Sequence, residues 1–243
     1  MSSWSLFLPR DIRNYISSYL DQYNEFYPVI DNKKFLIEYY AEDIDTDKNI
    51  KDIINLQKLY CEYSNFTDKG LSYLINLQEL NCGFNEKNIN FTNEGLRHLT
   101  NLILLNCGCN SNFTDEGLKH LINLQELNCG FNTNFTDEGL SYLTNLQVLK
   151  CRNNLNFTDE GLSYLTNLQV LNCGNNINFT DEGLSYLTNL QVLNCGNNKN
   201  FTNEGLINLT NLIKLIKLYC GYKFTDEELK YLPNLKIYRY LFL

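Results

Sequence analysis

What the sequence lacks argues against several classes of function. Lysine and arginine number 20 against 28 aspartates and glutamates, which leaves a net charge of -8. Nucleic-acid binding needs a concentrated basic surface, so this acidic balance argues against it. No apolar stretch approaches the ~20 residues of a membrane-spanning helix. No glycine-rich phosphate loop, His-Glu-x-x-His motif or nucleophile elbow occurs, so we expect no catalysis and no cofactor or metal.

Two further features favour a reducing compartment. The first ten residues show no charged segment followed by an apolar one, so we expect no secretory signal. The nine cysteines are odd in number and recur mostly one at a time, which does not suggest a disulfide framework. Asn-Phe-Thr, a glycosylation acceptor outside the cell, recurs at Asn134, Asn156 and Asn178. We therefore expect a cytoplasmic or nuclear protein.

An internal repeat dominates the rest of the sequence. Asn-Phe-Thr-Asp-Glu-Gly-Leu-Ser-Tyr-Leu-Thr-Asn-Leu-Gln-Val-Leu begins at Asn134 and returns at Asn156 and Asn178. Cysteines mark one phase of this repeat from Cys61 to Cys220, mostly 22 residues apart, as from Cys129 to Cys151. A period of about 20–29 residues with leucines at fixed offsets predicts a stacked, solenoid architecture.

Each repeat has the pattern of one short strand followed by one short helix. In Val170-Leu171-Asn172-Cys173 the alternation predicts a strand with Leu171 and Cys173 facing inward. The segment from Thr180 to Leu187 reads as a helix capped by Thr180, with two acids at the favourable end of its dipole. One such unit would not fold alone, because its apolar face needs neighbours on both sides.

These residues resemble the leucine-rich-repeat superfamily, and within it the cysteine-containing subtype often found behind F-box modules. The resemblance covers about Leu56 to Leu243 and includes the Thr-Asp-x-Gly-Leu step after each strand. It implies an α/β solenoid with a parallel sheet on the concave face and short helices on the convex face. We expect residues 46–243 to form about eight repeats and a degenerate C-terminal strand. One departure is that cysteine stands on the strand, whereas the subtype carries it where Asn176 lies.

The repeated polar residues and cysteines have simple structural explanations. We expect the cysteines to stack in the interior as small hydrophobic groups. The asparagines that follow the strands should form a ladder whose amides satisfy backbone groups in the turns. The acids at the helix starts could suggest calcium, but their interaction with the helix dipole is sufficient. We expect one cysteine, Cys109, to lie outside the buried register.

Residues 1–45 have a different pattern. Leu8 to Leu20 reads as an amphipathic helix that begins at a proline, and residues 33–40 read as a further short helix. The first segment resembles the opening of an F-box, Leu-Pro-x-Glu-Ile-x-x-x-Ile-x-x-Tyr-Leu. That resemblance implies docking on the Skp-type adaptor of a cullin ubiquitin ligase, through Leu8, Pro9, Asp11, Ile12, Ile16 and Leu20. The alternative is a helical cap that covers the open core of the first repeat.

The concave face is the expected site for a protein partner. Outward strand residues should form columns, one from Lys58 to Val192 and its neighbour from Tyr60 to Asn194. Aromatic and charged residues on this face suit an interface. We expect the contacts to come from Tyr60, Tyr63, Phe84, Phe131, Lys150 and Arg152. Two functions fit this pattern: a substrate-recruiting F-box subunit of a ubiquitin ligase, or a leucine-rich-repeat binding protein with a helical cap.

Overall fold

The computed structural model describes most of the repeat region and little outside it. The described residues are 38–41, 46–51, 53–62, 64–83, 91–202, 204–205, 214–220, 229, 232, 234–235 and 237–238. Every statement on structure below concerns these residues.

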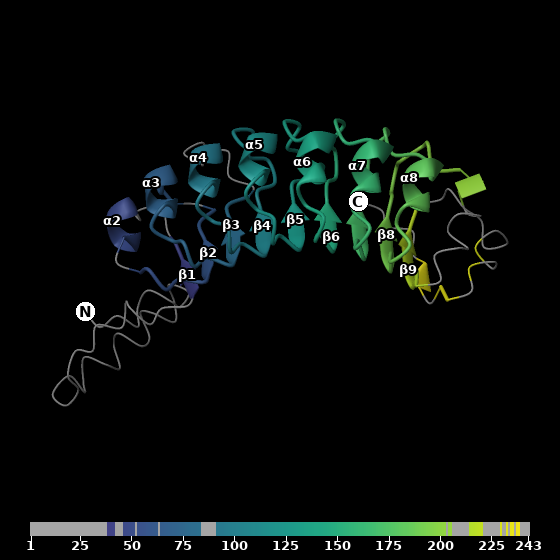
Figure 1. Cartoon of the computed structure of the whole chain (residues 1–243). Coiled ribbons are helices and arrows are strands. Elements are labelled where there is room, and N and C mark those ends of the chain that lie inside the picture. The colour runs from purple at the N-terminus through teal and green to yellow at the C-terminus, as the bar shows by residue number, and fades with distance from the viewer. Residues whose placement is uncertain are drawn as a thin grey trace, which may run out of the picture.

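The described strands form one parallel sheet in which the strands lie in sequence order, β1 to β10. They run along the inner side of an arch (Figure 1). Their bounds are β1 Glu38–Tyr40, β2 Lys58–Tyr60, β3 Glu79–Asn81, β4 Leu104–Asn106, β5 Glu126–Asn128, β6 Val148–Lys150, β7 Val170–Asn172, β8 Val192–Asn194, β9 Lys217–Tyr219 and β10 Ile237–Tyr238. Strand β10 is the C-terminal strand expected from the sequence, and it pairs with β9.

Short helices cover the outer side of the arch (Figure 1). Each is one turn or little more, and each lies between two consecutive strands. The described helices are α2 Asp47–Ile50, α3 Asp68–Leu71, α4 Asn93–Leu96, α5 Asp115–Leu118, α6 Asp137–Ser141, α7 Asp159–Ser163 and α8 Asp181–Ser185. One strand, one helix and their two turns make a rung of a leucine-rich-repeat solenoid, so the expected fold class is confirmed.

The core lies between the sheet and the helices, in layers shared by neighbouring rungs. Leu149 pairs with Leu171 across β6 and β7, and both side chains are fully buried. Cys151 and Cys173 are also fully buried, as is Phe157 from the turn that follows β6. Full burial of such apolar groups is worth roughly 1.5–3 kcal/mol each, so a rung gains its stability from stacking. The inward placement of leucine, cysteine and phenylalanine is confirmed.

Strand β1 corrects the expectation of a short helix over residues 33–40. Tyr39 is 2% exposed and takes the place of a core leucine, because it pairs with Leu59. Tyr40 on the same strand points outward and is 50% exposed. The alternation in Glu38-Tyr39-Tyr40 therefore follows the period of a strand, and the next strand supplies the hydrogen bonds. The sheet thus begins before residue 46, where the sequence placed the start of the solenoid.

The asparagine ladder in the turns is present as expected. The Asn132 amide donates to the Asn110 carbonyl at 2.7 Å and its Oδ1 accepts the Asn134 amide N–H at 2.9 Å. Asn154 repeats the first of these bonds, donating to the Asn132 carbonyl at 2.7 Å. Both side chains are fully buried. They satisfy backbone groups that would otherwise lose their hydrogen bonds to water, which makes the ladder part of the scaffold.

The aspartate that begins most of the described helices does more than the sequence suggested. Asp137 accepts two hydrogen bonds from the next rung, from the Thr158 N–H at 2.8 Å and the Thr158 hydroxyl at 2.6 Å. Thr158 in turn caps α7 by accepting from the Glu160 N–H at 3.3 Å. A Cβ on Gly161 would collide with the Asp137 carboxylate. The Thr-Asp-x-Gly step therefore joins consecutive rungs, in addition to any dipole effect.

Candidate protein-binding face

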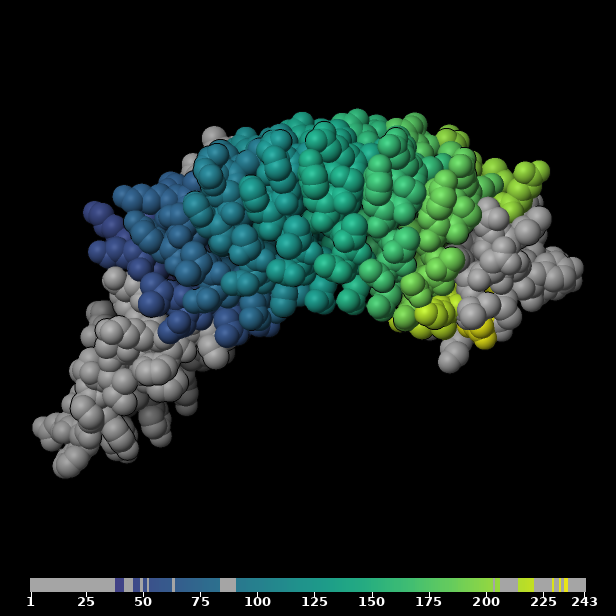
Figure 2. All heavy atoms as spheres, viewed as in Figure 1, coloured from purple at the N-terminus to yellow at the C-terminus, as the bar shows by residue number. Residues whose placement is uncertain are grey.

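The concave sheet presents two columns of outward side chains, as the sequence predicted. Paired positions place Lys58, Glu79, Leu104, Glu126, Val148, Val170 and Val192 side by side. The second column runs Tyr60, Asn81, Asn106, Asn128, Lys150, Asn172 and Asn194. Figure 2, in the same view, shows the surface hollowed along this inner side of the arch. Charged and aromatic groups lie toward β1, and valines lie toward β8.

A stacked pair of tyrosines marks the N-terminal end of this face. The rings of Tyr40 and Tyr60 lie 4.4 Å apart and almost parallel, at 5°. The Tyr40 hydroxyl donates to Glu38 Oε1 at 2.8 Å. This hydrogen bond to a carboxylate, together with burial, raises the pKa of Tyr40 to about 12. Burial also raises the pKa of Tyr60. The pair offers a flat aromatic platform of the kind that anchors interfaces.

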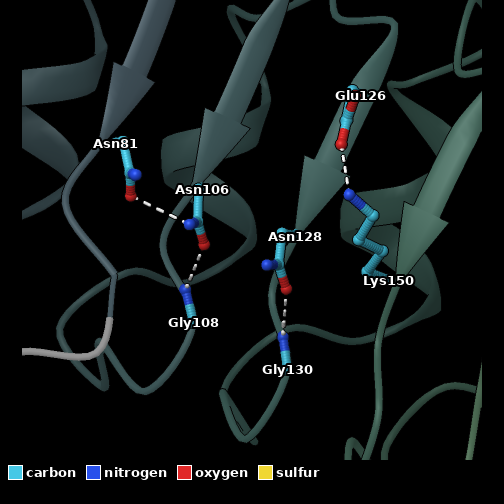
Figure 3. A network of polar contacts seen from close by, with 7 residues as sticks. All are labelled: Asn81, Asn106, Gly108, Glu126, Asn128, Gly130 and Lys150. Carbon is cyan, nitrogen blue, oxygen red and sulfur yellow. Dashed lines mark hydrogen bonds and ion pairs between the residues drawn. The ribbon is translucent and has the colours of Figure 1, made fainter. Parts of the chain in front are cut away.

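Polar contacts across strands fix the middle of the face (Figure 3). Lys150 on β6 donates to Glu126 on β5 at 2.6 Å. The Asn106 amide on β4 donates to Asn81 Oδ1 on β3 at 2.8 Å. Within one rung, the Gly130 N–H donates to Asn128 Oδ1 at 3.4 Å. Both members of the ion pair are partly exposed, so it contributes little to stability. It does hold a positive and a negative group at a defined position, which suits recognition.

Phe131 lies just beyond β5 in an unusual backbone conformation. Its φ is 64°, and its side chain is 52% exposed. The same phase holds asparagine in the next three rungs, at Asn153, Asn175 and Asn197, all with positive φ. Asparagine tolerates this left-handed region, whereas a bulky side chain is strained there. An exposed ring kept at a strained position is a candidate interface anchor.

The structure separates the predicted partner contacts into two places. Phe131, Lys150 and Arg152 lie on the adjacent rungs of β5 and β6, where the Phe131 N–H donates to the Arg152 carbonyl at 2.9 Å. Tyr60 lies on β2, three strands from β5 and four from β6, or ~14–19 Å at the usual strand spacing. The remaining predicted residues lie outside the described part of the chain: Tyr63, Phe84 and the adaptor contacts Leu8, Pro9, Asp11, Ile12, Ile16 and Leu20.

Sequence reasoning missed two features of the surface. It omitted Tyr40, although Glu38-Tyr39-Tyr40 has the same alternation as Lys58-Leu59-Tyr60 and could have revealed an additional strand. It also missed a groove of ≈ 1120 Å³ along the edge at which the strands begin, lined largely by asparagine and glutamine. The Asn-Leu-Gln that precedes most strands was the available signal, because its two polar residues flank a buried leucine.

The cysteines offer chemistry at one place only. Cys109 is exposed, as expected, while the other eight thiols are buried. Burial raises the pKa of Cys82 to about 12 and raises that of Cys151 well above its usual value. The buried thiols are therefore protonated and poorly reactive at neutral pH.

No cluster of three or more histidine, cysteine or acidic side chains in the described ranges could hold a metal ion. None of the helices described there is long and apolar enough to span a bilayer.

Comparison with known proteins supports the fold. No family model and no curated protein matches the sequence. Among solved structures, an internalin (InlF) of Listeria monocytogenes is 25% identical with a TM-score of 0.59, over 95% of this chain and 75% of that one. Internalin C2 of the same species is 25% identical with a TM-score of 0.55, over 86% and 82%. Rad7 of yeast, solved in complex with Elc1, is 19% identical with a TM-score of 0.54, over 84% and 69%. The chain is a leucine-rich-repeat scaffold.

Proposed function

We propose that this protein is a substrate-recruiting subunit of a Skp-cullin-F-box ubiquitin ligase. In this role the concave sheet holds a target protein, and the segment from Leu8 to Leu20 holds the Skp-type adaptor. The protein itself performs no catalysis. It raises the effective concentration of the target near the ligase, because both are held on the same protein.

The observation that carries the target-binding part is the group formed by Phe131, Lys150 and Arg152. It combines an exposed aromatic ring with two cations, and one of these is held by Glu126 at 2.6 Å. Aromatic residues and arginine supply a large share of binding energy at interfaces. The neighbouring rungs have Asn153 and Asn175 at the phase of Phe131, so the repeat itself does not require a ring there. A protein with a complementary acidic and apolar patch is the expected target.

The adaptor part rests on the sequence resemblance to an F-box. The fold of Rad7 offers one parallel: that leucine-rich-repeat protein was solved as a complex with Elc1. At 19% identity the likeness bears on the fold alone, so the adaptor assignment depends on Leu8, Pro9, Asp11, Ile12, Ile16 and Leu20.

Co-expression with a Skp-type adaptor tests the proposal. We expect the two proteins to co-purify, and we expect Leu8→Ala combined with Ile12→Glu to abolish this while the circular dichroism spectrum is unchanged. Phe131→Asn is the matched control, because it alters the concave side only and places the residue of the next three rungs at that phase. It should keep the adaptor. Absence of adaptor binding at micromolar protein would rule out the ligase role.

The second candidate is a leucine-rich-repeat binding protein in which the N-terminal residues only cap the solenoid. The core favours some cover at that end, since Tyr39 on β1 is buried at the edge of the described sheet. On this view the Leu8→Ala, Ile12→Glu variant loses stability rather than a partner. The co-expression experiment separates the two, because a cap predicts no adaptor in the purified sample.

We also propose that the protein works in the cytoplasm or nucleus. Eight of its cysteines are buried as free thiols, which suits a reducing compartment. The glycosylation acceptor Asn134 donates its amide to the Ser111 carbonyl of the preceding rung. A glycan on this nitrogen would add bulk beside the bond that joins the two rungs.

A further inference from the structure

A long groove lined by amide side chains follows the edge of the sheet at which the strands begin. Its volume is ≈ 1120 Å³, and it extends from the rung of Asn55 to Lys214. Most rungs contribute an asparagine three residues before the strand and a glutamine one residue before it, as Asn145 and Gln147 do before β6. The groove is separate from the concave contacts Phe131 and Arg152, which follow the strands.

The asparagines of this groove are fixed by the fold. The Asn145 amide donates to the Ile122 carbonyl at 3.0 Å, and the Asn167 amide donates to the Thr144 carbonyl at 3.0 Å. An NH₂ group has two hydrogens and its carbonyl oxygen has two lone pairs. One bond to the backbone therefore orients each amide and leaves further hydrogen-bonding capacity on the groove side.

The glutamines are not required by the fold. Ile103 takes the glutamine position before β4, and its carbonyl accepts the Gln125 N–H at 2.8 Å and the Glu126 N–H at 3.0 Å. The Gln147 carbonyl makes the same two bonds to the next rung, at 2.8 and 3.0 Å. The backbone ladder thus forms with either side chain. The Gln169 amide reaches Gln147 Oε1 only at 3.5 Å, so the row is weakly bonded within itself.

The lining indicates the chemistry of a ligand. Among the described residues, the lining contains no acidic group, although the whole chain carries a net charge of -8. The one charged residue among these lining residues is Lys214 at the far end, where the ammonium donates to Asn189 Oδ1 at 2.6 Å. The same described lining contains no aromatic ring on which a nucleobase or a sugar could stack. The row of asparagines and the row of glutamines can instead form hydrogen bonds with an uncharged chain in which donors and acceptors alternate. The main chain of an extended polypeptide is such a chain.

The spacing of the rungs favours one extended conformation. Two neighbouring strand intervals measure ~9.6 Å, and one three-residue turn of polyproline II measures ~9.3 Å. Every third residue of such a peptide therefore meets equivalent amides on every second rung. Seven intervals separate β2 from β9, or ~34 Å, which would hold about eleven residues. We propose that this groove binds an extended, uncharged polypeptide segment in the polyproline II conformation, through its main chain.

The probe is the twelve-residue peptide acetyl-(Ser-Pro-Thr)4-amide, titrated into the full ¹⁵N-labelled chain. We expect the glutamine side-chain amide signals to shift. A six-residue version should bind more weakly, because it spans fewer rungs. A version N-methylated at serine and threonine should lose most of its affinity, since it lacks the main-chain donors. Equal binding of the N-methylated peptide, or no binding at millimolar peptide, would overturn the proposal.

Isoleucine at the glutamine positions supplies the matched variants. Gln125→Ile, Gln147→Ile and Gln169→Ile together copy the side chain of Ile103 and should weaken binding on the order of a hundredfold, at about two- to tenfold for each hydrogen-bonding group. Val148→Ile is the control one residue further along the strand. It adds an isoleucine to the concave face and should leave the affinity unchanged. Unchanged affinity in the triple variant would refute the assignment.

A gain-of-binding variant does not depend on the triple variant folding. Ile103→Gln fills the interruption in the row and should tighten peptide binding about two- to tenfold. The Leu8→Ala, Ile12→Glu variant should bind the peptide as the natural chain does, so this test and the adaptor test fail independently. Peptide-induced shifts at Tyr60 and Lys150 with none at the glutamines would place the peptide on the concave sheet and contradict the proposal.

Discussion

Replacing Asp137 by alanine should destabilise the solenoid far more than replacing it by asparagine. The Asp137 carboxylate accepts from the N–H and the hydroxyl of Thr158 on the next rung, at 2.8 and 2.6 Å. Asparagine has a natural precedent at this position: Asn93 Oδ1 accepts the Thr114 N–H at 3.0 Å, and the Asn93 amide donates to the Thr114 hydroxyl oxygen at 2.8 Å. Both bonds between rungs therefore survive without the charge.

The magnitudes separate the two substitutions. A hydrogen bond to a charged group contributes about 1.5–3 kcal/mol, and Asp137 accepts two that are partly exposed, so alanine should cost about 2–4 kcal/mol. Asp137→Asn should cost about 1 kcal/mol, which is the usual worth of a helix N-cap bond. Thr114, the partner of Asn93 on the next rung, makes no side-chain cap bond to its helix, so we expect Thr158 to lose its cap bond in the same way. A pure dipole role predicts equal losses of about 0.3–1 kcal/mol for both variants, since both remove the charge.

Thermal unfolding followed by circular dichroism measures these differences. For a chain of this length we expect Tm to fall by about 2–4 °C per kcal/mol, hence by about 4–16 °C for Asp137→Ala and by about 2–4 °C for Asp137→Asn. Equal losses in the two variants would refute the inter-rung role and return the aspartate to a dipole effect. Glu138→Ala is the matched control, because Glu138 is an exposed acid in the same helix turn.

Two further predictions concern the thiols. One thiol in each folded chain, that of Cys109, should react rapidly with Ellman's reagent at pH 8, and all nine thiols should react in guanidinium. Rapid reaction of the folded Cys109→Ser variant would contradict this, because it would show that the buried thiols are accessible. The contribution of the thiols to stability should be constant below pH 9 and fall as the pH rises toward 12, since unfolded thiols ionise near 9.0 while burial holds the pKa of Cys82 at about 12. Each buried thiol should contribute about 1.4 kcal/mol per pH unit, so a slope unchanged in Cys151→Ala would contradict this origin.

The repeat made most of the fold predictable. Leucine, cysteine and phenylalanine recur at fixed offsets, so their burial, the outward columns and the asparagine ladder could each be assigned from spacing alone. Leu171 and Cys173 are buried where the alternation placed them, and Thr180 caps α8 as its position suggested. Such predictions succeed because each residue's environment repeats from rung to rung.

Predictions were wrong where a single rung departs from the repeat, and incomplete where a contact joins two rungs. Tyr39 stands where other rungs have leucine, so residues 38–40 did not resemble a strand until β2 was seen beside them. Asp137 was assigned to the helix dipole because its partner, Thr158, lies 21 residues away on the next rung. The division of the binding residues into Phe131 with Arg152, and Tyr60 with Tyr40, also depends on which strands become neighbours.

The sequence alone determined the period, the alternation of each strand, the inward side chains and the parallel stacking, since these follow from local pattern and from the need of every rung to bury its apolar face. The tertiary structure decided what lies between rungs: the link from Asp137 to Thr158, the left-handed backbone of Phe131 and the groove lined by Gln147 and its neighbours. These features join atoms about one full repeat apart, or they depend on the curvature that stacking produces. A short stretch of sequence therefore cannot reveal these features.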